Sequence, residues 1–253
     1  MIVSLHILSD VHLEFEDYSP SVETDIVILA GDIHVGVKGM AWARDHFPRS
    51  EIIYVAGNHE YYHHNYQILL KQFRNKAEQY NIHFLENDEV VLHDIRFLGC
   101  TLWTDYKCFE GLTQEAAMEM IKYRLADHHL IESTDGDGQT DYFSTNDALH
   151  IHTNTVSWLI RKLFDEPFDG KTVVVSHHGP SLACKHMIFG HSDFSGAFYS
   201  DLPDLMAKTD LWVYGHTHSN LDVDVNNTHL ISNQKGYPNE RVSGFDKNLR
   251  IFL

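Results

Sequence analysis

The chain has few cysteines and no long apolar segment, and each shortage argues against a class of protein. Cys100, Cys108 and Cys184 are the only cysteines among 253 residues, and they show no CxxC spacing. An odd number without paired spacing argues against a disulfide framework and favours a reducing compartment. No apolar stretch approaches the roughly 20 residues of a membrane helix, and the first residues show no signal-peptide pattern. We therefore expect a cytoplasmic protein without a membrane partner.

Positive charge is also scarce. Lysine and arginine total 19 against 36 aspartates and glutamates, which gives a formal net charge of −17. Binding to a nucleic-acid backbone needs clustered lysine and arginine, so nucleic acid is not the expected partner. The chain also has 20 histidines. If several of them bind divalent metal, the site becomes locally positive within an acidic protein. The net charge therefore does not exclude a small phosphorylated molecule as the substrate.

Length and apolar content favour a single domain spanning residues 1–253. Apolar residues make up 43% of the chain, which is enough for a sizeable core. The candidate site residues run from position 10 to position 218, so a division into two domains would have to split them. Residues 111–165 read as a largely helical insertion. This insertion is expected either as a cap beside the site or as a peripheral helical pair.

Five short apolar runs each end in small and polar residues. The runs are residues 2–8, 25–30, 52–55, 171–175 and 210–214. They end in Ser9-Asp10-Val11-His12, Gly31-Asp32, Gly57-Asn58-His59-Glu60, Ser176-His177-His178-Gly179 and Gly215-His216-Thr217-His218. Runs of this kind are typical of buried strands, and ligands of open α/β sheets bind at the carboxyl ends of strands. The five polar ends are therefore predicted to form one site.

The first three of these runs predict parallel strands. Residues 36–47 read as a helix between two strands, which makes a βαβ unit with a right-handed crossover. Asp10, Asp32 and Asn58 would then share one edge of the sheet. Asp10 and His12 lie two residues apart, as do His216 and His218. Side chains at this spacing in an extended segment point to the same side. Asp10 and His12 are therefore expected to face one point, and His216 and His218 to bind one or two metals from one side.

The remaining elements complete an α/β prediction. Residues 61–80 have the apolar spacing of one long amphipathic helix, and residues 113–127 and 146–164 also read as helices. Short runs between 82 and 102 suggest an antiparallel portion or a sheet edge. The alternation after Asn220, including residues 249–253, suggests antiparallel strands of a second sheet.

The polar strand ends suit a dinuclear metal site. Asp10, His12, Asp32, Asn58, His177, His216 and His218 would supply seven oxygen and nitrogen ligands, too many for one ion and appropriate for two. The absence of thiolates points to Mn, Fe, Zn or Co. An aspartate can bridge two ions, and two-metal sites promote in-line displacement at phosphorus by an acidified water.

With these motifs, the sequence resembles the calcineurin-like metallophosphoesterase superfamily, from Asp10 to His218. The resemblance implies a four-layer αββα sandwich with two mixed sheets and two divalent ions, Mn being favoured, at the carboxyl ends of the strands. It also implies that Asp32 bridges the ions. Asp10, His12 and His218 would complete one site, and Asn58, His177 and His216 the other. His59 would contact the phosphate and act as a catalytic group, and Asn58 would also orient the phosphate.

The expected activity is hydrolysis of small phosphomonoesters or phosphodiesters by a metal-bridged hydroxide. A catalytically weak scaffold is the first alternative, but such members typically lack the histidine after the asparagine, and His59 is present. A protein phosphatase is disfavoured because no arginine occurs in residues 9–12 or 57–60, and a nuclease is disfavoured by the net charge. We expect His34, His178 and Glu60 to lie behind the ligands or against the substrate. For the two histidines, a role in packing alone is an equally favoured alternative.

Overall fold

The computed structural model describes residues 2–109, 111–186 and 194–253 of the chain. Its first sheet holds five strands. In spatial order these are β13 (Arg250–Phe252), β1 (Ser4–Leu8), β2 (Ile26–Ala30), β3 (Glu51–Val55) and β4 (His83–Phe84). Strands β1 to β4 pair in parallel, and β13 pairs with β1 in the antiparallel sense. The predicted parallel arrangement of the first strands is confirmed.

The second sheet holds six strands and is also mixed. In spatial order these are β11 (Asp222–Val225), β12 (Thr228–Ile231), β10 (Leu211–Val213), β9 (Lys171–Ser176), β6 (Ile95–Cys100) and β5 (Asp88–Leu92). The four inner strands are parallel, and the two edge strands are antiparallel to their neighbours. Of the short strands predicted before residue 102, β5 and β6 form an antiparallel pair at the edge of this sheet, as expected, whereas β4 joins the first sheet in parallel with β3.

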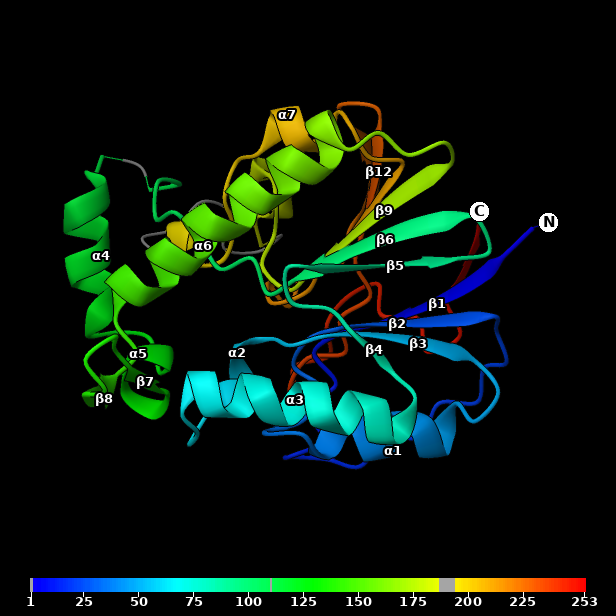
Figure 1. Cartoon of the computed structure of the whole chain (residues 1–253), viewed down its shortest axis with the longest axis horizontal. Coiled ribbons are helices and arrows are strands. Elements are labelled where there is room, and N and C mark those ends of the chain that lie inside the picture. Colours follow the sequence, from blue (N-terminus) through cyan, green and yellow to red (C-terminus); the bar gives the residue numbers. More distant parts are fainter. Residues whose placement is uncertain (1, 110, 187–193) are drawn as a thin grey trace.

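Helices cover the outer face of each sheet, so the molecule has four layers (Figure 1). Helices α1 (Lys38–His46) and α3 (Tyr66–Tyr80) pack on the first sheet, whereas α6 (Thr145–Ile160) and α7 (Pro203–Met206) pack on the second. Within β2, Val27 and Leu29 face the helices, and Ile26 and Ile28 face the other sheet. Because both faces of such a strand are buried, its sequence is a continuous apolar run. The predicted αββα sandwich is confirmed.

The remaining elements lie in the loops between strands. The segment at residues 111–165 contains α4 (Gln114–Lys122), α5 (Asp127–Leu130), a hairpin of β7 (Glu132–Thr134) and β8 (Thr140–Tyr142), helix α6 and a π-helical turn at Arg161–Asp165. Figure 1 shows α4, α5 and the hairpin on the side of the sandwich opposite the two termini. Two 3₁₀ turns follow β9, at Leu182–Cys184 and Ser195–Ala197. No helix among the described residues is long and apolar enough to cross a membrane.

Two predictions about secondary structure were wrong. The helix expected over residues 61–80 is two helices, α2 (Asn58–Tyr61) and α3. His63 has a left-handed φ of 64°, and the Asn65 side chain caps α3 by accepting a hydrogen bond from the Ile68 N–H. The final strand, β13, belongs to the first sheet rather than the second, because it pairs with β1. The apolar spacing carried no information about either the turn or the pairing partner.

The interface between the sheets should carry much of the stability. Phe97 on β6 is fully buried there, whereas Phe252 on β13 is 63% exposed. We expect Phe97→Ala to lower the free energy of unfolding by about 3–5 kcal/mol through lost burial and a residual cavity. Phe252→Ala, the matched control, should change it by about 0.5 kcal/mol or less. Urea unfolding measures both, and equal effects would contradict this placement of the core.

Candidate metal centre

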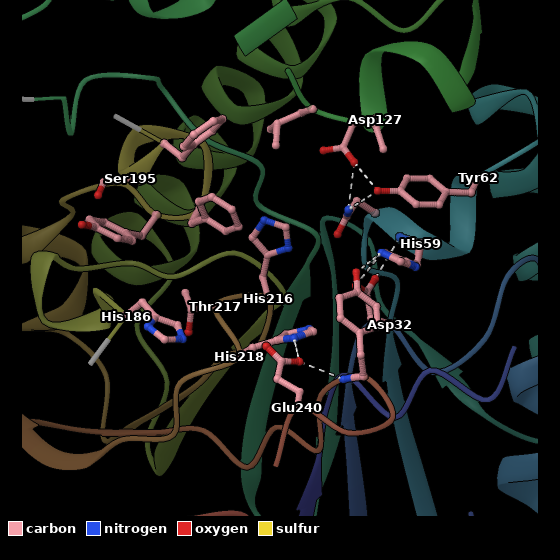
Figure 2. Close-up of a pocket in the computed structure, with 17 residues that line it drawn as sticks. Asp32, His59, Tyr62, Asp127, His186, Ser195, His216, Thr217, His218 and Glu240 are labelled. Atoms are coloured by element: carbon pink, nitrogen blue, oxygen red, sulfur yellow. Dashed lines mark hydrogen bonds and ion pairs between the residues drawn. The ribbon is translucent and has the colours of Figure 1, made fainter. Parts of the chain in front are cut away.

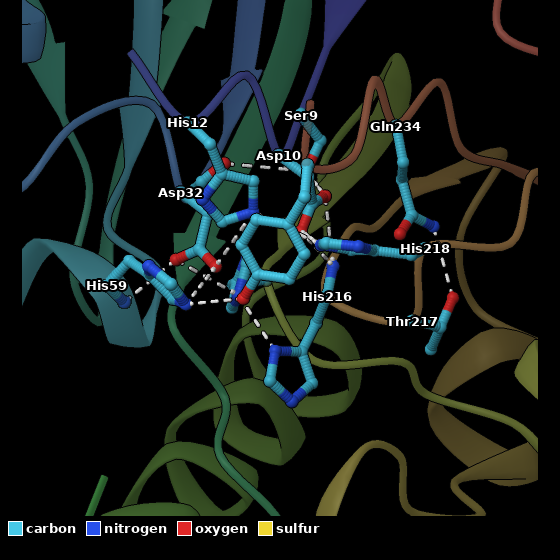
Figure 3. Close-up of polar contacts among 12 residues, drawn as sticks. Ser9, Asp10, His12, Asp32, His59, His216, Thr217, His218 and Gln234 are labelled. Carbon is cyan, nitrogen blue, oxygen red and sulfur yellow. Dashed lines mark hydrogen bonds and ion pairs between the residues drawn. The ribbon is translucent and has the colours of Figure 1, made fainter. Parts of the chain in front are cut away.

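The seven predicted ligands all follow the carboxyl ends of strands from both sheets. Asp10 and His12 follow β1, Asp32 follows β2, and Asn58 opens α2 just after β3. From the second sheet, His177 follows β9, and His216 and His218 follow β10. Figure 3 shows labelled side chains of both sheets turned toward one centre. The structure therefore brings together residues that are up to 208 positions apart in the sequence.

The side chains form two groups on either side of Asp32. In the first group, the Nε2 atoms of His12 and His218 lie 3.1 Å apart, and Asp10 Oδ1 lies 3.4 Å from His218 Nε2. In the second group, His177 Nε2 lies 3.0 Å from Asn58 Oδ1 and 3.1 Å from His216 Nδ1. An ion with ligand bonds of about 2.1 Å separates neighbouring octahedral ligand atoms by about 3.0 Å. The observed spacings therefore suit two coordination spheres.

Asp32 presents one carboxylate oxygen to each group. Its Oδ1 lies 3.4 Å from His177 Nε2, and its Oδ2 lies 3.9 Å from His12 Nε2. The side chain is 2% exposed. A buried carboxylate that faces two clusters of imidazole nitrogens has the position required of a bridge between two cations.

Hydrogen bonds on the outer ring nitrogens point the inner nitrogens at the centre. The Nδ1 atom of His177 lies 2.9 Å from the Ala30 carbonyl oxygen, and that of His218 lies 2.6 Å from Glu240 Oε2. His12 Nδ1 lies 3.2 Å from Glu14 Oε1. Imidazoles that bind metal commonly donate their second N–H to a carbonyl or carboxylate in this way. The donor set thus fits divalent ions without thiolates.

The backbone at this site is not extended, contrary to our expectation. The φ angles of Asp10, His12, Asp32, His216 and His218 lie between 46° and 71°, in the left-handed region. Each such residue costs on the order of 1–3 kcal/mol and persists only where the surroundings impose it. Asp10 and His12 do face one group of ligand atoms, whereas His216 and His218 face different groups. These directions arise because the chain turns sharply after each strand, not because of strand alternation.

Two glycines allow these turns to approach one another. A Cβ atom on Gly57 would collide with Asp32 Oδ1 and would lie 2.7 Å from His177 Cε1. A Cβ atom on Gly215 would collide with Ser9 Oγ and would lie 2.7 Å from Asp10 Oδ2. Only glycine leaves room for the carboxylates at these two positions.

Glu60 ties two of the turns together from behind. Its fully buried carboxylate accepts hydrogen bonds from the backbone N–H groups of Asp32, Ile33 and Gly57, each at 2.8 Å. The Tyr54 hydroxyl also donates to it. Glu60 therefore shapes the turns that carry Asp32 and Asn58, as expected of a structural hydrogen-bond acceptor.

The other two histidines differ in position. His178 is buried, and its ring lies 4.2 Å from that of His216 and 5.3 Å from that of His177. Burial and the charge of His177 lower the pKa of His178 to about 3, so it packs behind these rings as a neutral group. The Nδ1 atom of His34 lies 3.1 Å from the carbonyl oxygen of Val35. Within the described contacts, His34 does not reach the seven side chains.

His59 faces the same centre from the first turn of α2. Its Nδ1 lies 3.0 Å from Glu14 Oε1, and its Nε2 lies 2.9 Å from the Tyr237 hydroxyl. Burial lowers the pKa of His59, but the charges of Asp32 and Glu14 outweigh it and raise the pKa overall. Potential ligand atoms of His59, His12 and Asp32 also lie within 4.8 Å of one another.

Sequence reasoning missed Glu14, Asp127 and Tyr237. Asp127, on α5, accepts hydrogen bonds from Asn58 Nδ2 at 2.8 Å and from the Tyr62 hydroxyl at 2.7 Å (Figure 2). These bonds turn the carbonyl oxygen of Asn58 toward His177. The ring of Tyr237 stacks on His12 at 4.4 Å. The only available signal was that Glu14 lies two residues after His12, because Asp127 and Tyr237 are far from the ligands in the sequence.

Charges in the site stabilise the ionised Asp32 and the protonated forms of His177 and His218, whereas burial and the neighbouring histidines lower the pKa of His216. Burial raises the pKa of Asp32, but the neighbouring His177 and His59 lower it well below its usual range. Burial lowers the pKa of His177, but the charge of Asp32 raises it to about 9. Hydrogen bonds to Asp10 and Glu240 likewise overcome burial and raise the pKa of His218 to about 10.

A cavity of about 650 Å³ opens beside the candidate metal ligands (Figure 2). One part of its lining is formed by Asp32, Asn58, His59, His216 and His218. The remainder comes from Tyr62, His186 and Thr217, from residues 125–127, from residues around 194–199 and from the loop that carries Tyr237 and Glu240. A volume of this size suits a small organic ligand.

Comparisons with known proteins agree with this geometry. Residues 4–220 match the family model described as calcineurin-like phosphoesterase. The uncharacterized protein L509 of Acanthamoeba polyphaga mimivirus is 28% identical over 207 residues, which cover 76% of this chain and 70% of the viral protein. The solved phosphopantetheinyl hydrolase PptH of Mycobacterium tuberculosis is 20% identical, with a TM-score of 0.75 over 98% of this chain and 95% of its own. At that identity the likeness concerns the fold.

The bonds to Asp127 should matter for metal affinity. Asp127→Ala removes both acceptor bonds and releases the Asn58 amide, so we expect about 10–100-fold weaker Mn²⁺ binding at one of two sites. Asp127→Asn keeps an acceptor oxygen and should restore most of the affinity. Asp141→Ala, on the exposed strand β8, is the matched control. Isothermal titration calorimetry measures all three, and unchanged affinity in Asp127→Ala would contradict this role.

Metal binding should release protons. His177 and His218 have raised pKa values of about 9 and about 10, so both are protonated at pH 7.5 in the metal-free protein. A metal ligand must be a neutral imidazole, so binding should release about two protons, and affinity should rise as the pH increases toward 9. Calorimetry of Mn²⁺ binding in buffers of different ionisation enthalpy counts the protons. A heat that is independent of the buffer would contradict the assignment of these ligands.

Proposed function

This chain belongs to the calcineurin-like phosphoesterase family, and from that premise we propose that it hydrolyses small phosphoesters at a dinuclear metal centre. Asp10, His12 and His218 would hold one ion, and Asn58, His177 and His216 the other, with Asp32 shared. The observation that carries the proposal is the orientation of Asp32, whose two oxygens face separate groups of ligand atoms beside an accessible cavity.

The donor set favours Mn²⁺, with Fe, Zn and Co as alternatives, because it contains oxygen and nitrogen atoms only. Such ions supply Lewis acidity and a water that is acidic enough to attack phosphorus at neutral pH. The protein's own residues then have to bind the phosphoryl group, orient it and manage the proton of the leaving group.

His59 is suited to supply that proton. The Glu14 carboxylate accepts a hydrogen bond from the Nδ1–H of His59. This bond fixes the ring and leaves Nε2 of His59 directed at the cavity. The charges of Asp32 and Glu14 raise the pKa of His59, which favours the protonated imidazole that a general acid requires. The Tyr237 hydroxyl, 2.9 Å from Nε2, marks a position where an oxygen of the substrate could accept this proton. The Asn58 amide beside it would orient the phosphoryl group.

A small substrate, monoester or diester, is favoured over a macromolecular one. The net charge of −17 counts against a nuclease, and the lack of arginine in residues 9–12 and 57–60 counts against a protein phosphatase. The intact His59–Glu14 pair argues against a scaffold without activity.

The segment at residues 111–165 would act as one wall of the substrate cavity, within a single domain. Leu125, Ala126 and Asp127 line the cavity, and Asp127 bonds Asn58. Cys100, Cys108 and Cys184 of the chain are unpaired, which suits the reducing conditions of the cytoplasm.

Hydrolysis of p-nitrophenyl phosphate and bis-p-nitrophenyl phosphate in the presence of Mn²⁺ tests this function. His59→Asn should lower kcat by about 10²–10⁴-fold because the general acid is lost, while the metal content by elemental analysis should stay unchanged. The control His150→Asn alters an exposed histidine on α6 and should retain full activity. Loss of an ion in His59→Asn would make His59 a ligand instead. A metal-loaded wild type that hydrolyses neither ester would refute the function.

A further inference from the structure

The cavity beside the candidate metal ligands, called here the metal cluster, has two chemically different parts. The part described above carries the ligands and His59. Away from it, Leu125, Phe194, Phe198 and Tyr199 line the space. Phe198 also connects the parts, because its ring lies 4.8 Å from that of His216. A phosphoryl group bound at the metal cluster would therefore direct the rest of its molecule along aromatic and aliphatic side chains.

Beyond the candidate ligands and His59, the charged side chains that line the cavity are acidic, and the only other titratable base described there is His186, whose pKa is lowered by burial. Asp127 and Glu240 line the cavity, and no lysine or arginine does so among the described residues. Residues 1, 110 and 187–193, which the structure does not describe, include no lysine or arginine either. Arg124 is exposed, with its guanidinium carbon 5.2 Å from the ring centroid of Phe194, and it is not among the lining residues.

This lining disfavours a second anionic group on the substrate. A further phosphate or a carboxylate in the cavity would lose hydration without gaining a cation, and it would be repelled by Asp127 and Glu240. An apolar group would instead exchange water for ring contacts at little electrostatic cost. The cavity volume of about 650 Å³ is sufficient for such a group.

We infer that the substrate carries a single phosphoryl function on an uncharged, largely apolar or aromatic organic group, which binds against Leu125, Phe194, Phe198 and Tyr199. The inference rests on the proposed function, because it takes the metal cluster as the site of the phosphoryl group. It separates such esters from nucleoside diphosphates, sugar bisphosphates and other compounds with several anionic groups.

Binding of phosphonates, which are not hydrolysed, tests this selectivity without relying on turnover. We would titrate the Mn²⁺-loaded protein calorimetrically with ethylphosphonate, 2-phenylethylphosphonate, 2-(2-naphthyl)ethylphosphonate and 2-(4-carboxyphenyl)ethylphosphonate. The naphthyl compound should bind about tenfold or more tightly than the ethyl compound, through the added apolar contact. The carboxyphenyl compound should bind about tenfold more weakly than the phenyl compound. Equal or tighter binding of the carboxyphenyl compound, or no gain from the naphthyl ring, would overturn the inference.

A charge introduced into the wall provides a second test. Leu125→Lys places a cation in the lining and should reverse the order of the phenyl and carboxyphenyl compounds. Ile160→Lys, at a 46% exposed position on α6 outside the cavity lining, should leave that order as in the wild type. An unchanged order in a folded Leu125→Lys protein, verified by circular dichroism, would show that the organic group lies elsewhere and overturn the inference.

Turnover separates this inference from the proposed function. If simple phosphate esters are hydrolysed but the phosphonates show no selectivity, the function stands and the inference fails. If the phosphonates bind in the expected order but the corresponding phosphate esters are not hydrolysed, the inference about the binding group stands and the proposed hydrolytic function fails.

Discussion

The buried Glu60 carboxylate is the interaction on which the metal centre depends. It accepts three backbone N–H groups from the turns after β2 and β3 and a hydroxyl from Tyr54. Without this acceptor, each buried donor would cost about 1–3 kcal/mol, and nothing else described satisfies them. Glu60 thereby holds Asp32 at its left-handed φ of 55° and fixes where Asn58 and His59 enter the site. Every other feature of the centre is arranged around the position of Asp32.

The centre also requires the two sheets to stay packed together. Asp32 and Asn58 come from the first sheet, and His177 and His216 from the second, with the His177 ring hydrogen-bonded to the Ala30 carbonyl oxygen across the interface. Gly57 and Gly215 keep that approach free of Cβ atoms. Because the ligands of each group come from both sheets, metal affinity and the stability of the sandwich should be linked. The segment at residues 111–165 adds a third contribution through Asp127, which orients the amide of Asn58.

Much of this arrangement could be predicted from local patterns. Apolar runs that end in Asp, Asn or His indicated both the strands and the side chains at their ends, and the structure brings all seven of these side chains together. The left-handed turns could not be predicted, because residue type constrains φ only weakly for Asp and His. Asp127 and Tyr237 were missed because their contacts span long sequence separations. The same reason hid the pairing of β13 with β1, whose apolar spacing would suit either sheet.

The central claim is that two ions share the Asp32 carboxylate. An anomalous difference map from crystals grown with Mn²⁺ and recorded above the manganese edge tests it most directly. The account predicts two peaks per chain, about 3.5–4 Å apart, one beside Asp10, His12 and His218 and one beside Asn58, His177 and His216. A single peak, or two peaks that do not flank Asp32, would contradict it.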